Sequence, residues 1–489
     1  MRVLFVASEC VPVAKTGGLA DVVGALPKAL RAMGVDARVL MPGYPGVMAR
    51  AGTAEEVWRS GDLFSRRGVL RRADVAGLDL LALDCPEFFD REGLYVTEAG
   101  EDWPDNPFRF AALSRAAAEI ARDGLADGWR PDIVHAHDWQ TGLVALYLDA
   151  WGVDGVATLL TIHNISYQGV FEAGLRRDLG MPESGFTAEG YEFYGRVNFL
   201  KAGLVHSDLV TTVSPTYARE LESPEFGWGL EGVLAARPER AIGILNGIDT
   251  AAWDPANDPA VPTFTSRTMS GRNSARADLL RRFSIDAGRP GPLFGVVSRL
   301  TDQKGLDLLL GVLPDMLRAG GSLVVLGSGD RRLEQAFRTA GSDHAGSVGV
   351  RIGYDEDLAH LIYAGSDAIM VPSRFEPCGL TQMYAMRYGA LPVVARTGGL
   401  ADTVIDANAA ALSAGVATGF QFEPGSREAL SNAIAKVFAV YSERGLWRKM
   451  QRNAMKHPVG WEGPAERYVD LYARLMAAET GKRGFSGTR

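Results

Sequence analysis

The hexapeptide Thr-Gly-Gly-Leu-Ala-Asp occurs twice, at 16–21 and at 397–402, and each copy follows an apolar run typical of a buried strand. Glycines at the carboxyl end of a strand let backbone N–H groups approach a ligand closely, because no side chain stands in the way. One such turn is a weak signal, since short glycine-rich turns also occur without a ligand. The duplicate indicates two related halves that face one cleft.

Continuous apolar runs bounded by turn residues recur along the first half of the chain. They predict central parallel strands that are buried on both faces. These runs cover residues 3–7, 37–41, 78–83, 133–136, 157–162, 209–213 and 242–245. Helical patterns lie between several of them, at 19–33, 108–122 and 141–151. This alternation predicts a doubly wound α/β domain.

A second series of the same kind follows a polar stretch at 257–273. Its predicted strands are 294–298, 323–326, 350–353, 368–371 and 392–395, and its predicted helices are 306–317, 356–363 and 382–388. We therefore predict two Rossmann-like domains, at 1–250 and 251–460. A further helix is expected at 461–478, and residues 479–489 are expected to form a disordered tail.

Composition excludes several classes of protein. The chain has 489 residues, 47% of them hydrophobic and 22% charged, which is typical of a soluble globular protein with more than one core. A net charge of −8 argues against a nucleic-acid surface, and no run approaches the ~20 apolar residues of a membrane span. The three cysteines are widely spaced with no CxxC pair, which favours a reducing cytoplasm.

The first glycine turn lies between a lysine and an aspartate. A functional interpretation has Lys15 neutralise a phosphate while Gly17 and Gly18 donate N–H groups to it at a helix start. The alternative is a tight turn with a surface lysine and with Asp21 as an ordinary acidic helix start. In the second copy, Arg396 precedes the turn.

Two cations flank a predicted strand-to-helix loop at 299–304. Arg299 and Lys304 would converge on a small polyanion there, because arginine offers a two-pronged donor and lysine a point charge. A pair of solvated basic side chains is the alternative. Lysine just before a helix is unfavourable for the helix dipole, so we favour the functional interpretation.

The least ordinary string is Ser-Arg-Phe-Glu-Pro-Cys-Gly-Leu-Thr-Gln at 373–382. Glu376 follows a buried strand, and a carboxylate there could accept two sugar hydroxyl groups. The N–H groups of residues 379–381, at the start of a helix, could meet a phosphate. A helix-start carboxylate is the alternative for Glu376, and a small buried packing residue is the alternative for Cys378.

Two histidine-containing strings also end predicted strands, at 135–140 and 161–164. Ligands of open α/β sheets gather at such ends, so Asp138, His163 and Asn164 are candidate site residues. The His-x-His pair at 135–137 could bind a metal, but no further ligand motif is near in sequence, so no metal site is predicted. The acidic run 355–357 is better explained as a helix start than as a metal site.

Several common enzyme signatures are absent. Gly327-Ser328-Gly329 continues to Arg332, where a dinucleotide fingerprint would have its third glycine. No GxxxxGK[ST] or GxSxG string occurs. These absences argue against a nicotinamide enzyme, a P-loop kinase and a serine hydrolase.

Taken together and in order, six strings resemble the family of bacterial glycogen synthases and plant starch synthases. They are Lys-Thr-Gly-Gly-Leu-Ala-Asp-Val at 15–22, His-Ala-His-Asp-Trp-Gln at 135–140, Thr-Ile-His-Asn at 161–164, Asn-Gly-Ile-Asp at 246–249, Ser-Arg-Leu-Thr-Asp-Gln-Lys-Gly at 298–305 and the string at 373–382. The resemblance implies a GT-B fold, in which two Rossmann-like domains face a central cleft and a C-terminal helix crosses back to the first. It implies metal-free, cofactor-free transfer of glucose from ADP-glucose to the non-reducing end of an α-1,4-glucan, with retention.

The same resemblance implies which residues bind the donor. Lys15, Gly18 and Asp21 match the family's nucleotide-sugar loop, and Arg299 and Lys304 match its diphosphate clamp. Among the substrate-binding residues we also include the helix-start group Cys378, Gly379, Leu380 and Thr381.

For the sugar and the base, the resemblance implies five further positions. Glu376 matches the carboxylate on the donor glucose, and His163 and Asn246 match residues beside the glucosyl unit. Asp138 matches an active-site acid, and Tyr354 matches the ring stacked on adenine.

One departure from the wider GT-B pattern favours the starch and glycogen synthases over other GT-B transferases. Many GT-B enzymes have a second glutamate eight positions after the first. This chain has Tyr384 there, a departure that starch and glycogen synthases share.

Four alternative functions stay open: a nucleotide-sugar epimerase, a sucrose-forming transferase, a silent glucan-binding protein and a phosphorylase. No nucleophilic carboxylate is evident, so we expect same-face attack, with His163 steadying the cationic sugar and Asp138 as an optional proton relay.

Overall fold

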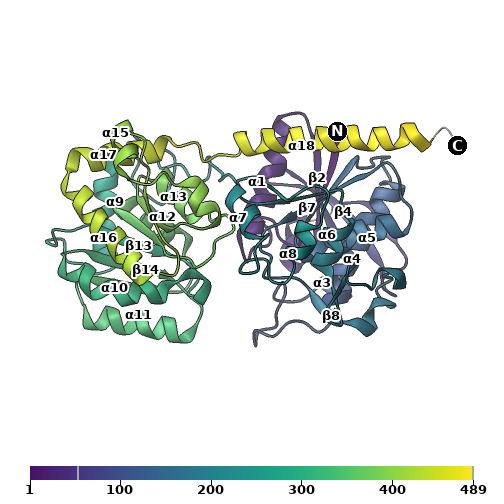
Figure 1. The fold of residues 1–489 in the computed structure, drawn as a ribbon, viewed down its shortest axis with the longest axis horizontal. Coiled ribbons are helices and arrows are strands. Elements are labelled where there is room, and N and C mark those ends of the chain that lie inside the picture. Colours follow the sequence, from purple (N-terminus) through teal and green to yellow (C-terminus); the bar gives the residue numbers. More distant parts are fainter. Residues whose placement is uncertain (52–53, 487–489) are drawn as a thin grey trace. The chain divides into compact units, whose positions relative to one another are not determined.

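A computed structural model describes residues 1–51 and 54–486 of the chain. The chain divides into two compact units, Met1–Asn246 with Trp461–Arg489 and Gly247–Gly460. Figure 1 shows the elements of each unit along the sequence. Within the described residues, no helix combines the length and apolar character needed to cross a membrane.

The first unit is built on a nine-stranded sheet with strand order β12-β11-β7-β6-β1-β2-β5-β4-β3. Its parallel strands are β1 (Arg2–Val6), β2 (Asp36–Pro42), β5 (Leu78–Asp84), β6 (Ile133–His137), β7 (Ala157–Ile162), β11 (Leu209–Thr212) and β12 (Ile242–Gly243). All seven predicted strands are therefore present. The order reverses at β1, which pairs with β2 on one side and β6 on the other, so the carboxyl ends of β1 and β6 border the crevice where such sheets bind ligands.

Two antiparallel strands extend one edge of this sheet and were not predicted. They are β3 (Glu55–Ser60) and β4 (Gly68–Val75), and they carry arginines and glutamates with mixed exposure. Arg72 on β4 pairs with Asp79 on β5 at 2.8 Å. An edge strand with one wet face has no continuous apolar run, which is why the sequence did not reveal it. A small separate sheet has the order β8-β10-β9, from β8 (Val170–Glu172), β9 (Glu192–Phe193) and β10 (Arg196–Asn198).

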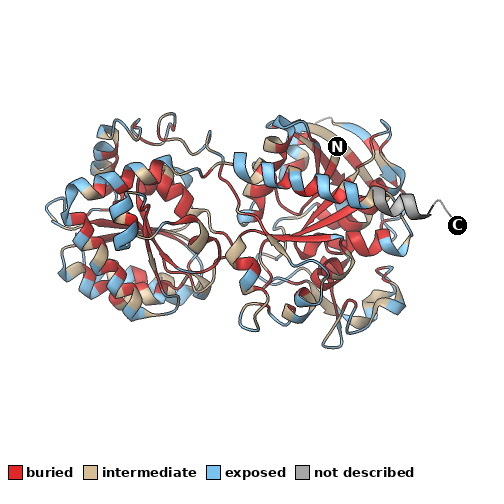
Figure 2. Cartoon of the chain, turned by 45° about the horizontal axis from the view of Figure 1, so that its top comes forward, coloured by how far each residue is buried: buried red, intermediate tan, exposed pale blue. Residues whose placement is uncertain are grey.

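Helices cover the strands of the first unit, whose central residues are buried (Figure 2). They are α1 (Gly18–Ala32), α2 (Pro45–Ala51), α3 (Pro86–Phe89), α4 (Asn106–Asp123), α5 (Leu143–Ala150), α6 (Phe199–His206), α7 (Pro215–Glu220), α8 (Glu231–Ala235) and α18 (Glu462–Ser486). The last helix packs on α1 and β7 of the same unit. It continues beyond the predicted end at 478, so the expectation of a tail from 479 is wrong as far as 486, and residues 487–489 lie outside the described residues.

The second unit is built on a six-stranded parallel sheet of order β15-β14-β13-β16-β17-β18. Its strands are β13 (Leu293–Val297), β14 (Ser322–Gly327), β15 (Val348–Ile352), β16 (Ala368–Val371), β17 (Leu391–Ala395) and β18 (Phe420–Phe422). The five predicted strands are present, and only the short edge strand β18 was missed. The order reverses between β13 and β16, so their carboxyl ends flank the second ligand crevice.

The helices of the second unit cover both faces of its sheet. They are α9 (Ser270–Arg282), α10 (Leu306–Arg318), α11 (Arg331–Asp343), α12 (Glu356–Gly365), α13 (Thr381–Arg387), α14 (Gly398–Thr403), α15 (Ala409–Ala414), α16 (Arg427–Ser442) and α17 (Arg444–Lys456). The predicted helices correspond to α10, α12 and α13. Asp355 accepts a hydrogen bond from the Leu358 N–H and so caps α12, as its interpretation as a helix start predicted.

Candidate active site

The first glycine turn is organised by a buried glutamate, Glu9, which the sequence analysis did not select. Its carboxylate accepts hydrogen bonds from the N–H and hydroxyl of Thr16, from the Gly17 N–H at 3.0 Å and from the Tyr95 hydroxyl at 2.6 Å. The Gly17 N–H thus donates to Glu9 in this structure, and its role at a phosphate stays a prediction. The sequence feature that could have identified Glu9 is an acidic residue shortly after the buried strand β1.

Lys15 and Asp21 are paired with each other across the same turn. The Lys15 ammonium lies 2.8 Å from the Asp21 carboxylate, and the lysine is partly exposed. Gly18 lies at the start of α1, and an added Cβ there would meet open space. The turn thus presents one accessible cation and the start of a fifteen-residue helix at the carboxyl end of β1.

Asp138 organises the ends of two neighbouring strands, β6 and β7. Its Oδ1 accepts hydrogen bonds from the N–H groups of His163 at 2.7 Å and Asn164 at 3.4 Å. Its backbone has φ +56°, a left-handed conformation that is uncommon outside glycine. Strained residues of this kind cluster at functional sites, where the surroundings hold them in place. The structure therefore brings Asp138, His163 and Asn164 together as predicted from their strands.

Burial raises the pKa of Asp138 and lowers the pKa of His163. Desolvation raises the pKa of Asp138 to about 7, with two N–H groups lowering it and Glu9 raising it. Desolvation lowers the pKa of His163 to about 3. His163 is therefore neutral near pH 7, and its Nε2 lies 2.9 Å from His137 Nδ1.

The His-x-His pair has a structural explanation. His135 lies 2.7 Å from the Tyr472 hydroxyl of α18 and 2.6 Å from the Thr161 hydroxyl, so both ring nitrogens are used. Among the residues that the structure describes, no group of three or more histidine, cysteine or carboxylate side chains is arranged to hold a metal. The pair helps to fix α18 onto the first unit.

Asn246 is the last residue of the first unit before the chain enters the second, and it lies beyond β12, at the far edge of the sheet. Its side chain is 6% exposed, and its Oδ1 has no hydrogen-bond partner within the described part of the chain. A buried amide oxygen without a partner is costly, and a ligand hydroxyl would satisfy it. A role for Asn246 beside the glucosyl unit stays a prediction.

In the second unit, Lys304 and Glu376 form a largely buried ion pair. The lysine Nζ lies 2.6 Å from Glu376 Oε2, with side-chain exposures of 18% and 9%. The Ser373 hydroxyl donates to the same oxygen at 2.8 Å. The two residues selected for separate roles therefore touch, and Glu376 is held in place by a cation and a hydroxyl.

The loops after β13 and β16 are fixed to one another around this pair. The Arg374 guanidinium binds the Asp307 carboxylate at 2.7 Å, and the Arg374 backbone N–H donates to the Gln303 carbonyl at 2.8 Å. Gly305 has φ +60°, and a Cβ there would collide with the Pro372 carbonyl. The close approach of the two loops therefore requires glycine at 305.

The second glycine turn supports the Glu376 loop directly. The Gly399 N–H donates to the carbonyls of Glu376 and Pro377, and a Cβ at Gly398 or Gly399 would collide with backbone of residues 376–378. Close backbone packing therefore explains these two glycines. The Gly399 N–H is therefore used within the protein in this structure.

The remaining predicted residues of the second unit lie near its strand ends. Arg299 is exposed just after β13 and makes no side-chain hydrogen bond or ion pair among the described residues. Gly379 has φ +72°, and Leu380 is the cap residue before α13, which begins at Thr381. Cys378 is buried beside them and forms no disulfide with another described cysteine. Tyr354 lies beyond the edge strand β15, is 77% exposed, and donates to Glu356 at 3.2 Å.

Asp138→Asn is expected to change how stability depends on pH. The raised pKa means that the native protein holds a proton on Asp138 between about pH 4 and 7, where the unfolded chain has released it. The stability due to this group is therefore present at low pH and is lost as pH rises through about 7. The unfolding free energy of wild type minus that of the variant should fall across this window, by up to ~1.4 kcal/mol per pH unit, and level off above it.

Denaturant unfolding of both proteins from about pH 4.5 to 8.5, which spans this window, measures that difference. The buried histidines are common to both proteins and cancel in the subtraction. A difference that stays constant with pH would show that Asp138 is ionised throughout.

Comparisons with known proteins agree with this geometry. A model of the starch synthase catalytic domain matches residues 2–236, and a model described as glycosyl transferases group 1 matches residues 281–457. A glycogen synthase of Roseobacter denitrificans is 54% identical over 478 residues, which is 97% of this chain and 100% of the relative. A glycogen synthase of Rhizobium meliloti is 51% identical over 98% of this chain and 100% of the relative.

Solved structures give the same answer. The catalytic domain of starch synthase IV from Arabidopsis thaliana, bound to ADP and acarbose, has a TM-score of 0.86 and 33% identity, covering 97% of this chain and 99% of that one. A sucrose-phosphate synthase from Thermosynechococcus elongatus, at 18% identity and a TM-score of 0.61 over 98% of this chain and 99% of that one, shares the fold. The predicted GT-B fold is confirmed, and the chain belongs to the bacterial glycogen synthase family of glycosyltransferases.

Proposed function

We propose that the protein transfers glucose from ADP-glucose to the non-reducing end of an α-1,4-glucan with retention of anomeric configuration. The observation that carries the proposal is the buried Lys304–Glu376 pair at the carboxyl ends of β13 and β16. It sets a cation for a leaving diphosphate beside a carboxylate for sugar hydroxyls. The resemblance to a starch synthase bound to ADP and acarbose supports the same donor and acceptor classes.

Breaking the anomeric C–O bond leaves negative charge on the diphosphate and positive charge on the sugar. Lys304 and Arg299 would stabilise the diphosphate, with backbone N–H groups of residues 379–381. Lys15, Gly18 and Asp21 would complete the donor site from the first unit. Glu376 would accept hydrogen bonds from donor hydroxyls, because Lys304 and Ser373 bind only one of its oxygens.

The first unit would supply the groups beside the sugar. A neutral His163 places no positive charge near a cationic glucosyl unit, which suits a steadying role better than a protonated imidazole would. Asn246 and Asn164 would donate or accept hydrogen bonds with sugar hydroxyls. Asp138, with a pKa of about 7, could exchange a proton near neutral pH and relay it from the acceptor.

Attack from the leaving-group side gives retention without a covalent intermediate. The departing phosphate then takes the acceptor proton as the new glycosidic bond forms. We also place the protein in the cytoplasm, a proposal supported by its three buried cysteines, none of which forms a disulfide in the part of the chain that the structure describes.

The position and configuration of the new linkage can be tested on the product. Glycogen extended with labelled glucose should release its label first when digested by an exo-acting enzyme that removes α-1,4-linked glucose from non-reducing ends. Label that resists this digestion, or is released only after the bulk of the polymer, would contradict the proposal.

Tyr354→Ala is expected to raise KM for ADP-glucose by about ten-fold or more with a smaller change in kcat. The ring is largely exposed, so adenine could stack on it, and base–aromatic stacking is worth roughly 1–3 kcal/mol. Preference for ADP-glucose over UDP-glucose should shrink, because adenine has the larger π-face. Tyr354→Phe keeps the ring, loses the hydroxyl contact to Glu356 and should stay near wild type. If KM and donor preference are unchanged in Tyr354→Ala, the base is bound elsewhere.

A further inference from the structure

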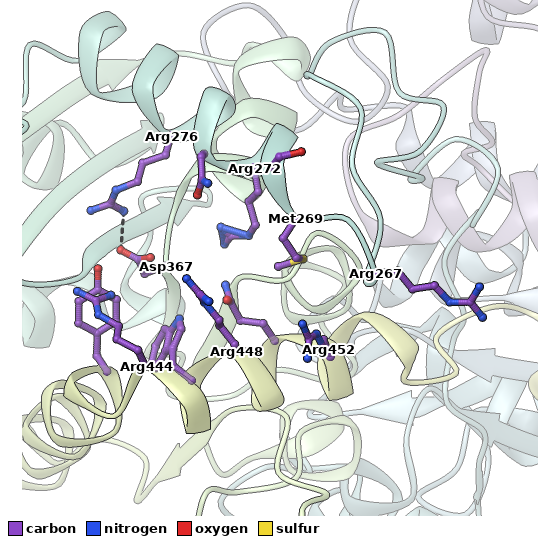
Figure 3. A pocket seen from close by; sticks show the side chains of 13 residues that line it. Arg267, Met269, Arg272, Arg276, Asp367, Arg444, Arg448 and Arg452 are labelled. Carbon is purple, nitrogen blue, oxygen red and sulfur yellow. Dashed lines mark hydrogen bonds and ion pairs between the residues drawn. The ribbon is translucent and has the colours of Figure 1, made fainter.

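A cavity of about 650 Å³ in the second unit is lined by thirteen residues, six of which are arginines (Figure 3). Its charged side chains are Arg267, Arg272, Arg276, Arg444, Arg448, Arg452 and Asp367. Asp367 immediately precedes β16, whereas Glu376 follows that strand. The cavity therefore lies at the amino end of the sheet, opposite the candidate active site of this unit.

The cavity holds one carboxylate for six guanidinium groups. Asp367 is paired with Arg276 at 2.5 Å, which leaves the other arginines without an acidic partner in the lining. Arg272 is 6% exposed and donates to the backbone carbonyls of Ser366 and Tyr388. Burial, together with the nearby Arg276, lowers the pKa of Arg272 to about 10, against the opposing effect of Asp367. The chain as a whole carries −8, so this positive cluster is local.

The arginines repeat at a spacing that sets like charges side by side. Arg444, Arg448 and Arg452 are four residues apart on α17, which contains no aspartate or glutamate. Arg272 and Arg276 have the same spacing on α9, and Figure 3 shows these two and the α17 arginines around one space. Like charges at this spacing destabilise a helix, and a bound anion would remove the repulsion.

Two further observations show unused binding capacity. Arg448 and Arg452 are exposed and make no hydrogen bond or ion pair with any residue that the structure describes. Trp447 also lines the cavity, is 3% exposed, and has an indole N–H without a hydrogen-bond partner among the described residues. An unsatisfied buried donor is costly unless an acceptor reaches it.

We propose that this cavity binds a small phosphorylated metabolite that carries two or more negative charges. Arginine forks match phosphate oxygens in pairs, and the volume lies within the range of small-molecule sites. The net negative charge of the chain opposes long polyanions and anionic membranes, so a compact ligand fits better than either.

The ligand would also contact side chains that hold one end of α13. Arg272 donates to the Tyr388 carbonyl at 3.2 Å, and Gln451, another lining residue, donates to the Gly389 carbonyl at 2.8 Å. The other end of α13 begins at Thr381 in the candidate active site. Occupancy of the cavity is thus connected to the site through a single short helix.

Calorimetric titration of the full chain with tripolyphosphate, with saturating ADP present, tests this proposal. We expect one site per chain, and we expect Arg448→Gln/Arg452→Gln to weaken its affinity by about ten-fold or more, the scale of losing charge-assisted hydrogen bonds. Both residues are exposed, so the double variant should fold. If it does not, either single substitution should still weaken the affinity for tripolyphosphate several-fold. Arg331→Gln/Arg332→Gln on α11 removes the same charge outside the cavity and should bind as wild type does.

The other results would overturn the proposal. These are no binding of tripolyphosphate, an equal loss of affinity in the α11 control, or a loss in Arg299→Ala, which would place the anion in the candidate active site. Binding to phosphatidylserine vesicles or heparin without binding to tripolyphosphate would show that the surface takes a macromolecule instead. Because binding is measured without turnover, failure here leaves the proposed transferase activity untouched.

Discussion

Lys304→Ala is expected to lower kcat by roughly 10²–10³, the scale of losing one preorganised charge that stabilises a transition state. Lys304 Nζ lies against Glu376, and both side chains are largely buried. Its removal takes positive charge from the leaving diphosphate and leaves the Glu376 carboxylate with the Ser373 hydroxyl. Arg299→Ala should cause a loss of the same order, although Arg299 is exposed and supports no other described residue.

Steady-state kinetics with ADP-glucose and glycogen measure these losses. Lys436→Ala is the matched control, since Lys436 pairs with Asp406 at 3.1 Å in the same unit but away from the candidate site. It should keep near wild-type turnover. A folded Lys304→Ala or Arg299→Ala protein with wild-type kcat would remove the diphosphate clamp from the account.

Glu376→Ala is expected to lower kcat by at least the same roughly 10²–10³. We also expect that the wild-type protein forms no covalent glucosyl-enzyme. One carboxylate oxygen is bound by Lys304 and Ser373, which suits a fixed acceptor of sugar hydroxyl hydrogens. Loss of the carboxylate also leaves Lys304 buried without its partner, which destabilises proteins. A thermal melt of the variant therefore has to accompany its kinetics.

Intact-protein mass spectrometry of wild type with ADP-glucose and no acceptor tests the second half of this prediction. No species heavier by one glucosyl unit should accumulate. Glu376→Gln keeps the shape of the side chain and one oxygen acceptor, so it should retain more activity than Glu376→Ala. Glucose trapped on any carboxylate would overturn same-face attack.

The central strands of both units could be predicted because each is a continuous apolar run buried on both faces. β3, β4 and β18 could not be predicted: β3 and β4 form the antiparallel end of the first sheet and are only partly buried, and β18 is a very short edge strand. α9 was missed for a related reason: its exposed face is rich in arginine, and only Ala275 and Leu279 are apolar on its buried side.

Site residues that directly follow a predicted strand could be identified from the sequence. Contacts that depend on which strands lie next to each other in the sheet could not. Asp138 and His163 each end an apolar run, so their proximity follows from neighbouring strands. The contact between Lys304 and Glu376 requires β13 to lie beside β16, and this strand order cannot be deduced from the sequence alone. Glu9 was overlooked because its partners, Thr16 and Tyr95, are brought to it only by folding.

Tyr384 shows how tertiary structure gives a residue its meaning. The sequence marks it only as the position where many relatives of this fold have a glutamate. In the structure its ring stacks on Trp253 with centroids 3.9 Å apart, and Trp253 stacks on His360 at 3.9 Å. An aromatic side chain at 384 therefore completes a packed column, which a carboxylate could not do.

The most direct test of the account is to incubate the protein with labelled ADP-glucose and glycogen, and to count label in the precipitated polymer. We expect label in polymer that requires both protein and glycogen, less from UDP-glucose at equal concentration, and a roughly 10²–10³ lower rate with Lys304→Ala. Absence of label from the polymer, or label released only as free glucose or found on a small acceptor such as fructose, would contradict the claim that this protein elongates α-1,4-glucan.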